Sequence, residues 1–175
     1  TQSDDLGRVV VPKEIRRTLH IREGDPLEIF TDREGEIILK KYSLIGELSG
    51  FSKQYAEALA QTSGHIVSIT DRDQHIAVSG QGKKELLGKP LSKALERMIH
   101  QRMSNCCSQK DKAFVELIPG ENDAFQSEVI CPIIAEGDAI GAVIIASRDE
   151  KYKMGEVEKK LAAAAAAFLG RQMEQ

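Results

Sequence analysis

Five basic side chains gather near the start of the sequence, and a single acid lies among them. They are Arg8, Lys13, Arg16, Arg17 and Arg22, and the acid is Glu14. Guanidinium and ammonium groups bind phosphate oxygens, and the release of condensed counterions makes such binding strongly dependent on salt. The cluster could therefore contact DNA phosphates, and the residues alone leave this interpretation open. The alternative is a solvated surface whose cations pair with Glu14 or Glu23.

The residues around these cations predict a short strand followed by a helix. Val9–Val11 is an unbroken β-branched run, which is typical of a buried strand. Pro12 suits the first position of a helix, because its missing N–H has no intrahelical partner there. We expect a helix over Lys13–Leu19, with Ile15 and Leu19 stacked on one face. The two arginines of this helix then point away from its apolar face.

A hairpin is predicted after this helix. Gly24-Asp25-Pro26 ends the helical segment, and the strands Leu27–Phe30 and Glu36–Lys40 flank the turn Asp32–Gly35. A unit of about forty residues buries too little apolar surface to be stable alone, and usually needs a metal, disulfides or a partner chain. This segment has no cysteine and no metal-ligand pattern. We therefore expect it to dimerise, which doubles the basic cluster.

Residues 4–42 resemble the AbrB-type swapped-hairpin family of DNA-binding domains. The resemblance is carried by Leu6-Gly7-Arg8, three valines, Pro12 and a basic helix, and continues through Leu27–Phe30 and Ile37–Tyr42. It implies a swapped-hairpin β-barrel dimer that binds double-stranded DNA. The family's domain starts with a further strand bearing a basic residue, whereas only Thr1-Gln2-Ser3 precede the match here. We therefore expect the chain as written to dimerise or bind DNA less well than the family.

The resemblance also assigns roles to the cations. It makes Arg8 a position of DNA contact, presented outward by a tight turn at Gly7. Arg16 and Arg17 match the basic pair on the family's short helix. Lys13 and Arg22 are expected as flanking phosphate contacts. Backbone contacts of this kind position a protein, while the shape and deformability of the DNA can supply much of the specificity.

The composition excludes several classes of protein. The chain has 175 residues, 41% hydrophobic and 29% charged, with a net charge of −3, so a DNA-binding surface must come from local clustering or oligomerisation. No run reaches the ~18 apolar residues of a membrane span, and the acidic start is unlike a signal peptide. Cys106, Cys107 and Cys131 lack metal-ligand spacing and suggest reduced thiols. We expect a cytoplasmic protein with no metal and no cofactor.

A junction follows the first forty or so residues. Apolar residues then recur at helical spacing, namely Leu44, Ile45, Leu48, Phe51, Tyr55, Ala58 and Leu59. This pattern predicts a connecting helix whose apolar stripe serves either as core or as a seam with another subunit. We therefore divide the chain into a DNA-binding domain at 1–43, a connecting helix at 44–62 and a sensory or oligomerisation domain at 63–175.

The last of these parts predicts an α+β domain with a central antiparallel sheet and flanking helices. The expected strands are His65–Thr70, His75–Ser79, Phe114–Ile118, Gln126–Ile134 and Ala139–Ser147. The expected helices are Lys83–Leu87, Leu91–Met103 and Met154–Met173.

Residues 131–143 resemble the end of a GAF domain, where a strand ends at proline, turns through glycine and returns through a second glycine. GAF domains commonly hold a small ligand between the sheet and its covering loops. The resemblance makes candidates of Ile69, Ile76, Val78, Ser79, Gly80 and Ile130, and the alternative is ordinary core. The basic, glycine-rich loop from Ser79 to Lys84 precedes a helix and could hold an anion or simply form a turn.

An AbrB-type domain joined to a GAF-like domain in a chain of this length resembles a family of sporulation regulators of endospore-forming bacteria. The resemblance implies a transcription regulator in the forespore that activates some promoters and represses others. It also implies a homotetramer built from DNA-binding dimers with help from the flanking helices, and a GAF-like domain that modulates DNA binding. A ligand of that domain is left open.

Two other functions are considered. Some GAF proteins reduce free methionine sulfoxide through pocket cysteines, and Cys106, Cys107 and Cys131 could serve in this way, although nothing near them clearly lowers a thiol pKa. Swapped-hairpin domains also occur in antitoxins, where a disordered tail wraps the toxin. The residues that follow the hairpin here look folded. We therefore expect no catalytic residues and favour the transcription regulator.

Overall fold

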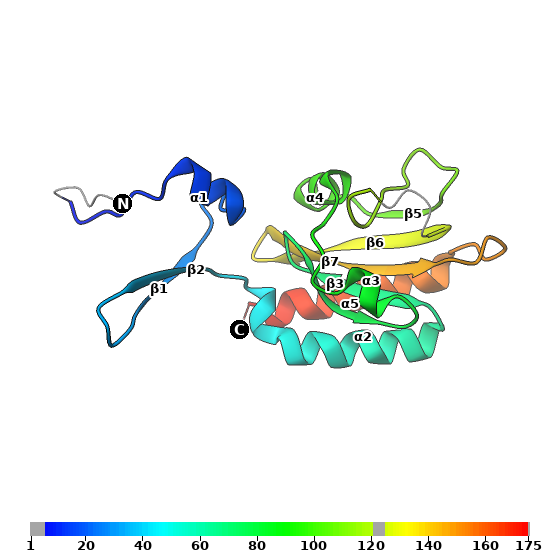
Figure 1. Cartoon of the computed structure of the whole chain (residues 1–175). Coiled ribbons are helices and arrows are strands. Elements are labelled where there is room, and N and C mark those ends of the chain that lie inside the picture. The colour runs from blue at the N-terminus through cyan, green and yellow to red at the C-terminus, as the bar shows by residue number, and fades with distance from the viewer. Residues whose placement is uncertain (1–5, 121–124, 175) are drawn as a thin grey trace. The chain divides into compact units, whose positions relative to one another are not determined.

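The chain divides into two units in a computed structural model that describes residues 6–120 and 125–174 (Figure 1). The first unit spans residues 1–43 and the second spans residues 44–175. The segment predicted as a separate connecting helix belongs to the second unit. It forms the short 3-10 helix η1 (Ile45–Leu48) and the helix α2 (Ser49–Ser63).

Within residues 6–43 the first unit contains one short helix and one hairpin. Helix α1 (Lys13–Thr18) precedes the strands β1 (Leu27–Thr31) and β2 (Ile37–Lys41), close to the predicted bounds. The strand predicted at Val9–Val11 is wrong for most of its length, because only a single bridge position forms, at Val9. A regular strand needs a neighbour for its backbone groups, and a single bridge supplies one for only a residue or two.

The hairpin turn is held by its own side chains. One carboxylate oxygen of Asp32, Oδ1, accepts hydrogen bonds from the backbone N–H groups of Glu34 and Glu36, at 2.9 and 2.8 Å. Gly35 has a φ of +84°, a left-handed conformation in which a side chain would be strained. The sheet register pairs Leu27 with Lys41 and Thr31 with Ile37.

No residue between 6 and 43 is buried. Nine large hydrophobic side chains of this range are substantially exposed: Leu6, Val9, Val10, Ile15, Leu19, Ile29, Phe30, Ile37 and Ile38. Neighbouring residues of a strand point to opposite faces, so the exposed pair Ile29 and Phe30 leaves both faces of the hairpin apolar. A surface of this kind calls for a partner chain to cover it.

The second unit is built on a five-stranded antiparallel sheet with the order β4-β3-β7-β6-β5. Its strands are β3 (Ile66–Thr70), β4 (His75–Ser79), β5 (Asn105–Ser108), β6 (Ser127–Ala135) and β7 (Asp138–Ser147). Gly141 on β7 lies so close to β3 that an added Cβ would fall 1.9 Å from the Thr70 carbonyl oxygen. The absence of a side chain there is what permits this close approach.

Helices cover both faces of the sheet (Figure 1). On one face, α2 and α5 (Glu156–Gln172) bury an aliphatic layer that includes Ala56, Val67 and Leu169. On the other, α3 (Lys83–Leu86) and α4 (Lys93–His100) bury a second layer that includes Leu86 and Leu95. Among the described residues, no helix is long and apolar enough to cross a membrane.

One predicted strand is misplaced. Residues 114–118 were expected to form a strand, but they run as irregular chain whose side chains contribute to the second layer. The fifth strand is β5, where Asn105 pairs with Ile130. Backbone groups of residues 114–118 form hydrogen bonds with side chains instead. The Val115 N–H donates to the Glu128 carboxylate, and the Glu116 carbonyl accepts from the Ser92 hydroxyl. The alternation of apolar residues alone does not distinguish a strand from an irregular segment whose side chains pack into the core.

Candidate nucleic-acid interface

Helix α1 carries three of the five predicted DNA-contacting cations. Lys13, Arg16 and Arg17 follow one another at i, i+3 and i+4, so they share one side of the helix, and all three are exposed. Ile15 and Leu19 are 46% and 47% exposed. The helix thus carries both cations that can meet phosphate and apolar side chains that need a cover.

The end of α1 is fixed by a tight reversal of the chain. The backbone N–H of Ile21 donates to the carbonyl of Arg16 at 2.8 Å, and His20 between them has a φ of +51°. This is a Schellman arrangement, in which a left-handed residue ends the helix; glycine usually occupies that position.

Lys41 ties the helix to the hairpin, a role that sequence reasoning missed. Its ammonium donates to the His20 carbonyl oxygen at 2.6 Å and lies 3.4 Å from a carboxylate oxygen of Asp25. In the sequence Lys41 is one more cation at the end of a strand. Only the return of β2 to the base of α1 shows that it positions the basic helix, and no sequence signal marks that contact.

The remaining two predicted cations flank α1. Arg8 is exposed and follows Gly7, whose φ of +72° provides the tight turn expected there. Arg22 begins the turn that leads into the hairpin, and its backbone N–H donates to the Asp25 carboxylate at 2.8 Å. All five predicted contact residues are exposed within the first unit.

The six candidate ligand-binding residues of the second unit do not share one site. Ile69 and Ile76 belong to the layer under α2 and α5, whereas Val78 and Ile130 belong to the layer under α3 and α4. Ser79 ends β4 at the edge of the sheet. Of the six, only Gly80 lines a pocket among those described in the structure.

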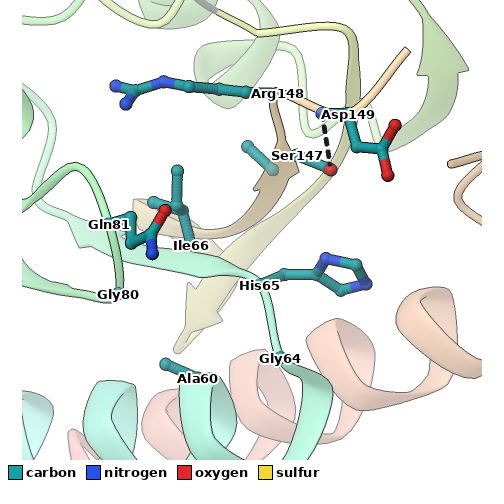
Figure 2. Close-up of a pocket in the computed structure, with 10 residues that line it drawn as sticks. Ala60, Gly64, His65, Ile66, Gly80, Gln81, Ser147, Arg148 and Asp149 are labelled. Atoms are coloured by element: carbon teal, nitrogen blue, oxygen red, sulfur yellow. Dashed lines mark hydrogen bonds between the residues drawn. The ribbon is translucent and has the colours of Figure 1, made fainter. Parts of the chain in front are cut away.

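The pocket at Gly80 has a volume of about 360 Å³ and lies where α2, β3, β4 and β7 meet at one end of the sheet (Figure 2). In Figure 2, Gln81 and Arg148 extend to one side of Ile66 and the His65 ring extends to the other. Arg148 forms an ion pair with Glu85, and its guanidinium lies 5.1 Å from the centre of the Phe125 ring. The pocket lining combines polar side chains such as Gln81 and Arg148 with apolar ones such as Ile66.

The three cysteines are poorly suited to nucleophilic chemistry. Burial raises the pKa of Cys106 and of Cys131 above the usual range. The pKa of Cys107 rises to about 12, first through burial and then through the neighbouring carboxylate of Glu128. A reactive cysteine needs a lowered pKa, because the thiolate is the nucleophile.

Glu128 is itself unusual, because its side chain is fully buried. Burial raises its pKa to about 7, against the opposing effect of hydrogen bonds from the Val115 N–H and the Asn105 side chain. Both bonds reach the same oxygen, Oε1, at 2.9 and 2.7 Å. Its other oxygen, Oε2, has no hydrogen-bond partner among the described residues.

Comparison with known protein families decides the assignment. The model of the stage V sporulation protein T C-terminal domain, a transcription factor, matches residues 47–174. A second model, of the MazE antidote-toxin recognition domain of bacterial antitoxins, matches residues 1–46. The chain belongs to the stage V sporulation protein T family.

Relatives from Bacillus subtilis (strain 168) agree with this family. Its stage V sporulation protein T is 58% identical over 172 residues, which are 98% of this chain and 94% of the relative. Its transition state regulatory protein AbrB is 67% identical over 39 residues, 22% of this chain and 40% of the relative. The chain is therefore a sporulation transcription regulator, not an enzyme, with an AbrB-type DNA-binding N-terminus and a GAF-like C-terminal domain. Its AbrB-like domain implies DNA binding and dimerisation.

Solved structures support the fold of the second unit. The GAF domain of an Acinetobacter phosphoenolpyruvate-protein phosphotransferase superimposes with a TM-score of 0.58 at 13% identity, covering 74% of this chain and 87% of that one. The cofactor-binding GAF domain of the nutrient sensor CodY from Clostridium difficile gives 0.54 at 11% identity, covering 69% and 83%. At these identities the likeness establishes the GAF fold alone, and confirms the α+β prediction.

Proposed function

We propose that two first units form a swapped-hairpin dimer that binds double-stranded DNA mainly through α1. The carrying observation is that α1 presents three exposed cations on a unit that has exposed hydrophobic side chains and no buried residue in its described range. Pairing two units covers the apolar surface and brings two copies of the cations together. Arg8 and Arg22 serve as flanking contacts in the same surface.

A salt titration tests this function. Binding of promoter DNA from an endospore-forming bacterium is measured for three proteins. They are the wild-type chain, the Arg16→Ala/Arg17→Ala variant and the control Arg33→Ala, which removes an exposed cation of the hairpin turn. Each lost phosphate contact lowers the slope of log K against log salt by roughly 0.9, so a dimer of the double variant, which lacks four arginines, loses a slope of about 4. The Arg33 variant should bind as the wild type does. Equal binding by all three proteins would refute the α1 interface.

The second unit is proposed to assemble these dimers into tetramers. Phe51 and Tyr55 on α2 each stack against Phe168 on α5, with ring centres 5.6 Å apart in both pairs. Phe51 and Phe168 remain 38% and 39% exposed. Aromatic side chains are enriched at the centres of protein interfaces, so this cluster is the proposed contact between dimers. Sedimentation should then show dimers for Phe51→Lys and tetramers for the wild type.

In this proposal the chain acts in the cytoplasm of the forespore, activating some sporulation promoters and repressing others. The second unit adjusts DNA affinity by changing the geometry of the assembled subunits, which requires a ligand or partner with different affinity for two arrangements. The pocket at Gly80 is the proposed place for a small ligand. Deleting the second unit from a chain whose dimer is held by a fused dimerisation segment should alter DNA affinity, and unchanged affinity would refute the coupling.

A further inference from the structure

One segment of the second unit carries an excess of positive charge. Residues 83–112 contain eight Lys and Arg against three Asp and Glu, whereas the whole chain contains 24 against 27. The segment thus has a strong positive excess in a protein of negative net charge. It comprises α3, α4, β5 and the residues that join and follow them.

All eight cations are exposed. They are Lys83, Lys84, Lys89, Lys93, Arg97, Arg102, Lys110 and Lys112, and together they are called the basic surface here. Within the described residues, the salt bridges involve one of them, Lys93, which lies 3.5 Å from Glu96. The other two acids of the segment have partners outside the eight cations. Glu85 pairs with Arg148, and the Asp111 carboxylate accepts a hydrogen bond from the Ser108 N–H. The cations are therefore available to an external anion.

Both helices of the segment pack on the same face of the sheet. Helix α4 lies over the sheet face opposite α2 and α5 (Figure 1), and Leu86 of α3 belongs to the same buried layer as Leu95 of α4. On α4, Leu95, Met98 and Ile99 point into the core, while Lys93 and Arg97 follow at i, i+4 on the outer side. Assembly through α2 and α5 would leave this face open.

Arg102, at the end of α4, holds its charge on a strained backbone. It ends α4 in a Schellman arrangement, where the Met103 N–H donates to the Met98 carbonyl at 3.0 Å, and its φ is +57°. A side chain in this conformation costs roughly 1–2 kcal/mol, and glycine is the usual residue. Strained positions of this kind often have a functional use, and here the residue that occupies the position is a cation.

The chemistry of the segment favours a phosphate backbone over an acidic protein. Residues 83–112 contain no Phe, Tyr or Trp, and six of the eight cations are lysines. Protein interfaces are enriched in aromatic residues and depleted of lysine, whereas Lys and Arg supply many contacts to DNA phosphates. DNA already held by the first units would also be present at high effective concentration.

We infer that the basic surface is a second DNA-contacting surface, which binds phosphates of the DNA that flanks the segment held by the AbrB-like units. The inference rests on the proposed function of the first unit. Its contacts are independent of sequence, so they extend the bound length of DNA and raise affinity without changing which promoter is chosen.

The test compares two lengths of DNA. One duplex is a promoter fragment trimmed to the footprint of an isolated AbrB-type dimer, and the other carries the same fragment with flanking DNA on both sides. The full chain is compared with Arg97→Gln/Lys110→Gln on the basic surface and with the matched control Lys151→Gln/Lys153→Gln, which removes two exposed cations outside it. Thermal unfolding first establishes that all three fold alike.

On the extended duplex, the basic-surface variant should lose a salt slope of about 2 per engaged second unit and bind roughly ten- to a hundredfold more weakly. On the trimmed duplex it should bind as the wild type does, and the control should match the wild type on both. An unchanged slope on the extended duplex, or an equal loss in the control, would overturn the inference.

The Arg16→Ala/Arg17→Ala variant separates this result from the proposed function. If that variant binds the trimmed duplex normally, the α1 interface is refuted, while the comparison on the extended duplex still decides the role of the basic surface. If it loses the trimmed duplex but keeps residual, salt-sensitive binding to the extended one, the basic surface is supported directly.

Discussion

The two units of the chain reach stability by different routes. The described part of the first unit, residues 6–43, contains no buried hydrophobic residue, while the second buries an aliphatic layer on each face of its sheet. The second unit therefore has its own hydrophobic core, whereas the first must take its stability from a partner. Stability that depends on a partner changes with protein concentration, and stability from an internal core does not.

The largest expected effect comes from placing a charge on the exposed apolar surface of the first unit. Ile29 is 65% exposed, and Val157 on α5 is 68% exposed. If dimerisation covers Ile29, Ile29→Lys removes two buried isoleucines per dimer, roughly 3–6 kcal/mol, and DNA binding disappears. Val157→Lys is the matched control and should leave both dimerisation and DNA binding intact. Sedimentation and DNA titration measure the two effects.

Two results would contradict this comparison. If Ile29→Lys stays dimeric and binds DNA normally, the exposed apolar surface has no partner. If Ile29→Lys and Val157→Lys reduce dimerisation and DNA binding equally, exposed apolar side chains in the first unit do not mark a dimer interface any more than those in the second. The melting temperature of the second unit should be unchanged by Ile29→Lys, because that unit has its own core.

A medium effect concerns the pH dependence of the second unit. The folded pKa of Glu128 is about 7, above the ordinary 4.5, so the folded state holds the proton more tightly than the unfolded chain. Its contribution to stability is fully present below about 4.5 and is lost as the pH rises to about 7. Glu128→Gln keeps the shape without the ionisation, and should be more stable than the wild type at pH 8 by up to about 3 kcal/mol.

The measurement is denaturant unfolding of both proteins from pH 4 to pH 8, read as the difference between them. Burial lowers the pKa of His75, so its contribution falls as the solution becomes acidic, in the opposite sense. This contribution is common to both proteins and cancels in the difference. A difference that does not change with pH would show that Glu128 does not titrate in this range.

The sequence predicted the first unit through its local signals. The hairpin bounds agree to within one residue, because turn residues such as Asp32 and Gly35 act over a few positions. The cations of α1 were found as a local cluster, and their expected contact with DNA came from the resemblance to the AbrB-type family. Lys41 was missed, because its contacts with His20 and Asp25 join residues that only the fold brings together.

The second unit was predicted less completely, because the features that were missed depend on which strands pair in the folded domain. β5 contains Asn105, Cys106, Cys107 and Ser108, a set with no alternating apolar pattern, and forms through its backbone pairing with β6. The ligand candidates were drawn from strands without knowledge of which face each residue takes. A register difference of one residue reverses the face, which is how Ile69 and Val78 came to lie in different layers.

The smallest expected effect compares the ends of the two cation-bearing helices. Both α1 and α4 end at a left-handed residue that is not glycine, His20 in the first unit and Arg102 in the second. Arg102→Gly relieves the strained backbone and should stabilise the second unit by up to about 1 kcal/mol. If Arg102 contacts phosphate, the same change lowers the salt slope on extended DNA by roughly 0.9 per engaged unit.

Arg102→Gln is the matched control, because it removes the charge and keeps the strain. It should lose the same salt slope with no gain in stability, as measured by denaturant unfolding and by titration of the extended duplex. A glycine variant that gains stability and keeps the wild-type slope would show that the left-handed arginine has no contact with DNA. A variant that gains stability and loses slope would instead show that the second unit gives up part of its stability to hold a cation at the end of α4.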